Sequence, residues 1–305
     1  MPHGVPLSEN AAHGALHPLA VGMRAHAVHA ATLHATAPAA LDFLAQPCAP
    51  SANALPPADP ALDSRWPRLW LLDARQDPEL SCHAARLSGV AHLALLPALV
   101  PGATPVEPAD AGLLPVLGLP ELRAWQDQWA TPVLVDVRLL DPQGFGPGAN
   151  SRAEQWAEAA LLSGTRLVLD LHALLVHSLQ RVELRARTQG QAVWPPNLMH
   201  EAEQVALDVV WSLPPGSVGL LALGGFQWPP EEATLPRLMR NHRVAPQGWT
   251  LFEAAIRHLG PLPTLLLWDS DLPPLAVLLD EVRLARQITQ PLAQGDAMPF
   301  TDPWV

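Results

Sequence analysis

The sequence contains no lysine and no tyrosine, so all 18 of its basic residues are arginine. Without lysine the chain has no Schiff-base nucleophile, and without tyrosine it has no phenolic acid. Cysteine is nearly absent as well, because Cys48 and Cys82 are the only two and they form no Cys-x-x-Cys pair. The sequence therefore gives no sign of a disulfide framework, a zinc ribbon or a dithiol redox motif.

Charge is scarce, at 15% of the residues, and the net charge is −11 with histidine neutral. Nucleic-acid binding depends on clustered cations that neutralise phosphates, and this balance disfavours it. The most apolar run, residues 90–100, is too short to span a bilayer and contains Pro97. The first ten residues lack the basic and apolar regions of a signal peptide. We therefore expect a cytoplasmic protein that binds neither nucleic acid nor a membrane.

Hydrophobic residues make up 49% of the 305 residues, which is enough for a large core. Short apolar runs rich in valine and leucine alternate with longer amphipathic stretches, a pattern typical of βα units around a parallel sheet. The expected strands are 20–24, 41–45, 68–73, 90–96, 132–137, 166–171, 217–223 and 264–269. The expected helices are 78–87, 119–130, 151–162, 198–212, 250–259 and 273–289. Eight strands predict an α/β fold, a TIM-type (β/α)8 barrel in a single domain.

The predicted barrel covers residues 19–292, with an N-terminal tail at 1–18 and a C-terminal tail at 293–305. Ser151 and Glu154 are spaced as a capping box at a helix start. Gly164 is expected to end that helix. Pro273 and Pro274 fit a first helical turn, where an N–H group has no partner within the helix.

Functional groups of such barrels project from the carboxyl ends of the strands. At or just after the predicted strand ends, the polar candidates are Cys48, Asp73, Asp136, Asp170, His172 and Asp269. Asp170 and His172 are two residues apart, so on a strand they would face the same side. The predicted ends of the fourth and seventh strands are apolar, which is a poor supply of ligands for a polynuclear metal site.

The stretch Pro-Thr-Leu-Leu-Leu-Trp-Asp at 263–269, followed by Asp271-Leu272-Pro273, is distinctive. It resembles the end of the multinuclear non-haem iron-dependent oxidative enzyme family, where the usual reading is Pro-Thr-Leu-Ile-Glu-Trp-Asp. Residues 163–170 resemble another segment of that family, and the resemblance runs from about residue 21 to about residue 288. It implies a barrel that binds two or three irons and modifies ribosomally made peptides.

Most metal-ligand positions of the family are not matched by ligands in this chain. Apolar side chains stand where the resemblance implies histidine or glutamate, and both histidines of the seventh-strand element are replaced. The positions concerned are Pro47, Ala49, Trp70, Ala91, residues 222–226 and Leu267. Arg240 stands where an anionic ligand is implied. Iron needs histidine and carboxylate donors, so these replacements predict that the multinuclear site is absent and that no metal cofactor is retained. The residual candidates are Asp136, Asp170, His172 and His242.

Three functions stay open from the sequence. The leading one is a non-catalytic partner or peptide-binding subunit in the maturation of a ribosomal peptide, with a precursor peptide or a partner enzyme as its ligand. The second is a metal-dependent oxidase that acts on peptide cysteines or a similar substrate. Its iron would be bound at a smaller site formed by Asp170, His172 and His242. The third is a different barrel enzyme that uses Asp136 and Asp170 as an acid–base pair. A purely structural alternative is an Asp170–His172 hydrogen bond that fills the space left by the metals.

The 11 tryptophans are a high number for this chain. Trp194, Trp228 and Trp249 occur in stretches with proline or glycine, which favours loops. Aromatic side chains and arginine are common anchors of protein interfaces. These three residues and Arg240 are therefore the predicted binding surface for a peptide or partner.

Overall fold

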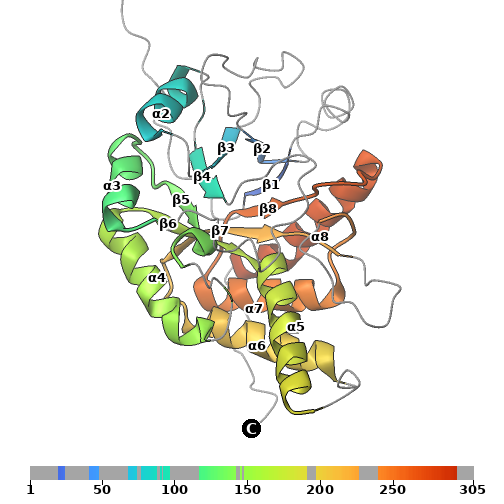
Figure 1. Ribbon diagram of the computed structural model, residues 1–305. Helices are drawn as coiled ribbons and strands as arrows, with labels where there is room; N and C mark the ends of the chain where they lie inside the picture. The colour runs from blue at the N-terminus through green and yellow to red at the C-terminus, as the bar shows by residue number, and fades with distance from the viewer. Residues whose placement is uncertain are drawn as a thin grey trace, which may run out of the picture.

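The computed structural model describes residues 20–24, 41–47, 68–73, 77–87, 90, 92–96, 117–141, 145, 148–190, 197–226 and 240–293. Eight parallel strands pair in chain order, and the eighth closes on the first to form a barrel (Figure 1). They are β1 (Val21–Arg24), β2 (Phe43–Pro47), β3 (Arg68–Asp73), β4 (His92–Leu96), β5 (Leu134–Asp136), β6 (Arg166–Asp170), β7 (Val218–Leu223) and β8 (Thr264–Leu266). All eight predicted strands and the predicted barrel are confirmed.

The helices lie outside the strands (Figure 1). They are α2 (Pro78–Leu87), α3 (Leu119–Asp127), α4 (Ala149–Ser163), α5 (Leu171–Thr188), α6 (Leu198–Ser212), α7 (Pro246–Leu259) and α8 (Leu275–Ala293), and a short 3-10 helix, η2 (Val137–Leu139), follows β5. The six predicted helices are confirmed, with ends that differ by up to four residues. In the described part of the chain, none of the helices is both long and apolar enough to cross a membrane.

Helix α5 was not predicted, because no loop separates it from β6. Asp170 is the last residue of the strand and also the N-cap of the helix, since its carboxylate accepts a hydrogen bond from the Ala173 amide at 3.0 Å. A continuous apolar run from strand to helix has no turn signal to mark the boundary. The expectation that Asp170 and His172 share a strand face is therefore wrong, because His172 lies in the first turn of α5.

Three helix boundaries test the predicted local chemistry. Helix α4 begins at Ala149 after Gly148, so the predicted Ser151 cap is wrong; the Ser151 hydroxyl instead donates to the Gly148 carbonyl at 2.8 Å. Gly164 ends the helix with a φ of 81°, as predicted, in the left-handed conformation that glycine adopts without strain. Pro273 and Pro274 precede α8, which begins at Leu275 and extends to Ala293, one residue into the predicted tail.

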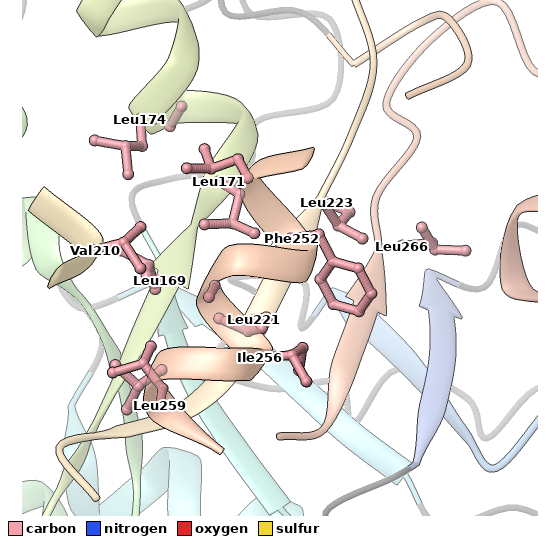
Figure 2. Close-up of a cluster of buried hydrophobic side chains, with 14 of the residues drawn as sticks. Leu169, Leu171, Leu174, Val210, Leu221, Leu223, Phe252, Ile256, Leu259 and Leu266 are labelled. Carbon is pink, nitrogen blue, oxygen red and sulfur yellow. The ribbon is translucent and has the colours of Figure 1, made fainter. Parts of the chain in front are cut away.

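Two apolar layers hold the barrel together. The inner layer fills the barrel with residues of β2 to β8 and two residues that flank strands, Ala20 before β1 and Leu267 after β8. The strand residues are Phe43, Ala45, Leu69, Leu71, Ala94, Leu96, Leu134, Val168, Leu220, Ala222 and Leu265. The outer layer joins the strands to the helices; around β6, β7 and β8 it includes Leu169, Leu221, Leu223, Phe252 and Ile256 (Figure 2). Trp70 belongs to an outer cluster, facing the helices and not the barrel interior.

Candidate functional site at the barrel mouth

Side-chain alternation places charged residues at one end of the barrel interior. On β5 and β6 the inward residues Leu134 and Val168 are followed, two positions on, by Asp136 and Asp170. Residues two apart on a strand face the same side, so both carboxylates continue the inner rows. The same spacing leads from Leu267 to Asp269 after β8. These are the carboxyl ends of the strands, where barrel enzymes carry their functional groups.

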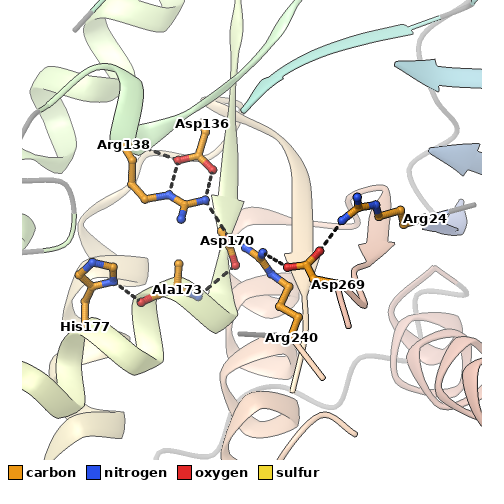
Figure 3. A network of polar contacts seen from close by, with 8 residues as sticks. All are labelled: Arg24, Asp136, Arg138, Asp170, Ala173, His177, Arg240 and Asp269. Atoms are coloured by element: carbon orange, nitrogen blue, oxygen red, sulfur yellow. Dashed lines mark hydrogen bonds and ion pairs between the residues drawn. The ribbon is translucent and has the colours of Figure 1, made fainter. Parts of the chain in front are cut away.

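Six charged side chains join in one continuous chain of ion pairs across this end, shown in Figure 3 and here termed the mouth network. In order of contact they are Asp136, Arg138, Asp170, Arg240, Asp269 and Arg24. They come from β5, η2, β6, the segment before α7, the segment after β8, and β1. Three arginines alternate with three aspartates, so the network carries no net charge.

Arg138 binds two aspartates. Its Nε and Nη2 donate to the two carboxylate oxygens of Asp136 at 2.8 and 2.7 Å, a paired geometry that fits the planar guanidinium. Nη2 also donates to Asp170 at 3.0 Å. Burial alone would lower the pKa of Arg138, but Asp136 and Asp170 outweigh it and raise that pKa above its usual value. Arg138 is therefore a fixed cation.

Asp170 is the central anion of the network and is almost fully buried. Arg240 and Arg138 bind the same carboxylate oxygen, Oδ2, while Oδ1 caps α5. Burial would raise the pKa of Asp170, but the two guanidiniums outweigh it and hold this pKa well below its ordinary value. The carboxyl is therefore ionised at neutral pH and has no proton to donate as a general acid.

Arg240 links the two halves of the network. Its guanidinium donates to Asp170 and, at 2.9 Å, to Asp269, and its backbone carbonyl accepts from the Asp269 amide at 2.6 Å. Burial opposes its charge, yet Asp170 and Asp269 raise the pKa of Arg240. Its side-chain stem passes over Gly224, where an added Cβ would lie 2.7 Å from the Arg240 stem carbons.

His172 is buried beside the network without joining it. Neither ring nitrogen has a partner at hydrogen-bonding geometry, although the Gly224 backbone approaches the ring. The ring instead packs against Phe226, with 5.8 Å between the ring centroids. Burial, and next the positive charge of Arg240, lower the pKa of His172 to about 3, so the imidazole is neutral. The proposed Asp170–His172 hydrogen bond is not formed.

His172 gives a measurable pH dependence. Its folded pKa lies below the unfolded value, so the unfolded chain takes up a proton as the pH falls and the folded chain does not. We expect the free energy of unfolding to fall by about 2 kcal/mol between about pH 8 and about pH 5 through this group. Urea titrations of the wild type and of His172→Gln measure it: the variant should lose this part of the slope, and identical slopes would contradict the assignment.

His242 lies at the entrance to the mouth and is half-buried. Its Nδ1 pairs with the Asn241 side chain at 3.0 Å, and its backbone forms a bridge with Gly225. A Cβ on Gly225 would lie 1.9 Å from the Arg243 carbonyl oxygen, so only glycine allows this approach. The Gly224-Gly225 pair, which lacks a phosphate-binding fingerprint, thus serves to bring residues 240–243 against the barrel.

The structure brings together three of the predicted site residues, Asp136, Asp170 and Arg240. Arg138 and Arg24 were missed, and Asp269 was noted only as a polar strand end. Trp249 lies in α7 and not in a loop, where it is half-buried and packs edge-on against Phe252 at 5.9 Å. Trp194 and Trp228 lie outside the described residues.

Comparison with known proteins finds a family model that is similar to the C-terminal third of the chain. Residues 198–290, which include Arg240, His242 and Asp269, match the family described as RiPP precursor modification enzyme MbnB/TglH/ChrH. The match covers less than a third of the chain. The abbreviation RiPP stands for a ribosomally synthesised and post-translationally modified peptide, so the description is of enzymes that modify precursor peptides.

Several curated proteins that are similar to parts of the chain carry the name UPF0276 protein. The chain is 28% identical over 144 residues to the one from Chromobacterium violaceum, covering 47% of this chain and 44% of that one. It is 51% identical over 45 residues to the one from Rhizorhabdus wittichii, covering 15% and 16%. The one from Acaryochloris marina is 33% identical over 79 residues, covering 26% and 28%. The matches therefore span less than half the length of these relatives.

Among solved structures, the crystal structure of a xylose isomerase domain protein from Planctomyces limnophilus is similar to this chain. The TM-score is 0.48 at 9% sequence identity, over 91% of this chain and 99% of that one. The barrel itself is defined by the strand pairing of this chain.

Proposed function

We propose that this chain is a non-catalytic member of the RiPP precursor modification family that binds a precursor peptide or a partner protein of the pathway. The observation that carries the proposal is the mouth network. Every carboxylate in it is already paired with arginine, and the central one, Asp170, receives two guanidiniums and a backbone amide.

A multinuclear iron centre does not fit this donor set. Iron requires carboxylate and histidine donors that are free to coordinate, whereas the three aspartates are held by Arg24, Arg138 and Arg240. A divalent ion beside these guanidiniums would meet charge repulsion inside a low-dielectric interior. Within the described ranges, no three side chains of His, Cys, Asp or Glu are grouped as metal ligands.

The second candidate is a metal-dependent oxidase with a reduced site at Asp170, His172 and His242. One observation favours it: both ring nitrogens of His172 are buried, without hydrogen bonds, and neutral. The Arg240 guanidinium opposes it, because it pairs with Asp170 and lowers the pKa of His172 by its charge.

Metal content separates the two candidates. The purified chain, reconstituted anaerobically with ferrous iron and then desalted, is expected to retain far less than one iron per chain in elemental analysis. Asp170→Ala serves as the comparison, because both the mouth network and the candidate metal site contain the Asp170 carboxylate. Near-stoichiometric iron in the wild type that disappears in Asp170→Ala would overturn the non-catalytic assignment.

Peptide binding tests the positive half of the proposal. The probe is a fluorescently labelled synthetic peptide that contains cysteine. Anisotropy should rise on binding and be unchanged by a chelator, and the peptide mass should stay constant with ferrous iron and oxygen present. A chelator-sensitive mass change produced by the chain alone would contradict the proposal. Trp249→Ala is the first variant to compare, since Trp249 belongs to the predicted binding surface and lies in the described part.

A further inference from the structure

The surroundings of Arg240 are those of a bound ligand more than those of a surface ion pair. Asp170 on β6 and Asp269 after β8 both contact its guanidinium. Each carboxylate accepts a hydrogen bond from one Nη nitrogen of Arg240. The Arg240 side chain is 4% exposed, so water screens these contacts little. The Nε atom is buried and has no hydrogen-bond partner among the described residues, so the hydrogen bonds of the guanidinium go to the two carboxylates.

The path of the stem is equally specific. The aliphatic part of Arg240 lies over Gly224, where any Cβ would come within 2.7 Å of it. The residue is anchored beyond its side chain by the hydrogen bond from the Asp269 amide to its carbonyl. Cutting the side chain back to Cβ therefore leaves a slot that runs past Gly224 and ends at two carboxylates.

We infer that Asp170 and Asp269 form a cation-binding site for a planar guanidinium group, which Arg240 of the same chain fills. The site takes an alkylguanidinium in preference to a spherical ion. Two carboxylates on opposite sides of a flat cation match the fork of N–H donors, whereas a divalent ion needs more donors converging at short distance. Arg138 on the far side of Asp170 adds repulsion for a second charge. The inference uses two aspartates of the mouth network but needs neither a bound peptide nor a partner protein, so it stands without the proposed binding function.

Chemical rescue tests the site. Arg240→Ala loses the guanidinium, and N-ethylguanidinium reproduces the lost atoms beyond Cβ. At millimolar concentrations, far below those that denature, it should raise the melting temperature of Arg240→Ala by about 4 °C at about 20 mM for a Kd of about 1 mM. The wild type should show no such rise, because its own side chain occupies the slot. Sodium and manganese(II) at the same ionic strength should give no specific rise in the variant.

One control variant and one alternative measurement make the test decisive. Arg240→Ala combined with Asp269→Asn retains the slot with one carboxylate fewer, so rescue should weaken at least tenfold in apparent Kd. If Arg240→Ala does not accumulate as folded protein, the refolding yield from urea with and without N-ethylguanidinium replaces the melting temperature. Equal rescue by manganese(II), equal rescue of the wild type, or no rescue in either measurement would overturn the inference. None of these outcomes depends on iron content or peptide binding.

Discussion

Replacing Asp170 by alanine is expected to lower the free energy of unfolding by about 3–5 kcal/mol. The change leaves Arg138 and Arg240 facing each other inside the barrel without the anion that joins them. Breaking a buried pair costs more than the pair contributes, because the remaining charge stays desolvated. Loss of the N-cap of α5 adds to the effect. Urea denaturation at neutral pH, followed by circular dichroism, measures the change.

Asp280→Ala is the matched control for Asp170→Ala. It also removes an aspartate that contacts two arginines, Arg243 and Arg283, but all three side chains are at least 46% exposed. Exposed pairs contribute little, so less than about 1 kcal/mol should be lost. Asp170→Asn adds a second comparison, since it keeps a side-chain oxygen for the cap and removes only the charge. Equal losses for Asp170→Ala and Asp280→Ala would contradict the central role given to Asp170.

Gly225→Ala has the second-largest expected effect, a loss of about 3 kcal/mol in the free energy of unfolding. The added Cβ would meet the Arg243 carbonyl oxygen at 1.9 Å and the His242 carbonyl oxygen at 2.2 Å. Both are backbone atoms and cannot rotate away, so the segment 240–243 must shift. Arg240 would shift with it and weaken its contacts to Asp170. The effect of combining Gly225→Ala with Asp170→Ala should therefore be smaller than the sum of the two.

Gly118→Ala is the control for added volume. Its Cβ would meet the Glu121 carboxylate at 2.9 Å, which is the end of a flexible side chain that can move aside. The φ of Gly118 is −83°, which alanine adopts without strain. We expect a loss of about 1 kcal/mol or less, mostly from the poorer N-cap. A Gly225→Ala variant as stable as Gly118→Ala would show that the segment 240–243 is not held against β7 as described.

Much of the barrel could be predicted because each strand carries its own pattern. Short runs of valine and leucine, separated by amphipathic helices, are local signals, and all eight strands and six helices followed from them. Helix α5 was not predicted because β6 continues directly into it at Asp170, without glycine, proline or a polar turn. A boundary with no turn residues leaves no mark in the sequence.

The mouth could be predicted only in part for a different reason. Asp136 and Asp170 stand at strand ends, which any strand assignment reveals. The arginines that neutralise them do not follow from spacing: Arg240 is 70 residues from Asp170, and Arg24 is 245 residues from Asp269. One signal was available for Arg24. It follows Ala20 and Gly22 at intervals of two, and this alternation puts it on the inner face of β1.

The neutrality of the mouth network has a consequence for how charged molecules approach the chain in solution. Because its three arginines and three aspartates cancel, the whole net charge of −11 lies elsewhere on the molecule. The long-range field is therefore negative, and it attracts cationic peptides at a distance while repelling acidic ones. The association rates of cationic and acidic peptides with the chain should therefore differ most at low ionic strength. The two rates should become similar as added salt shortens the Debye length.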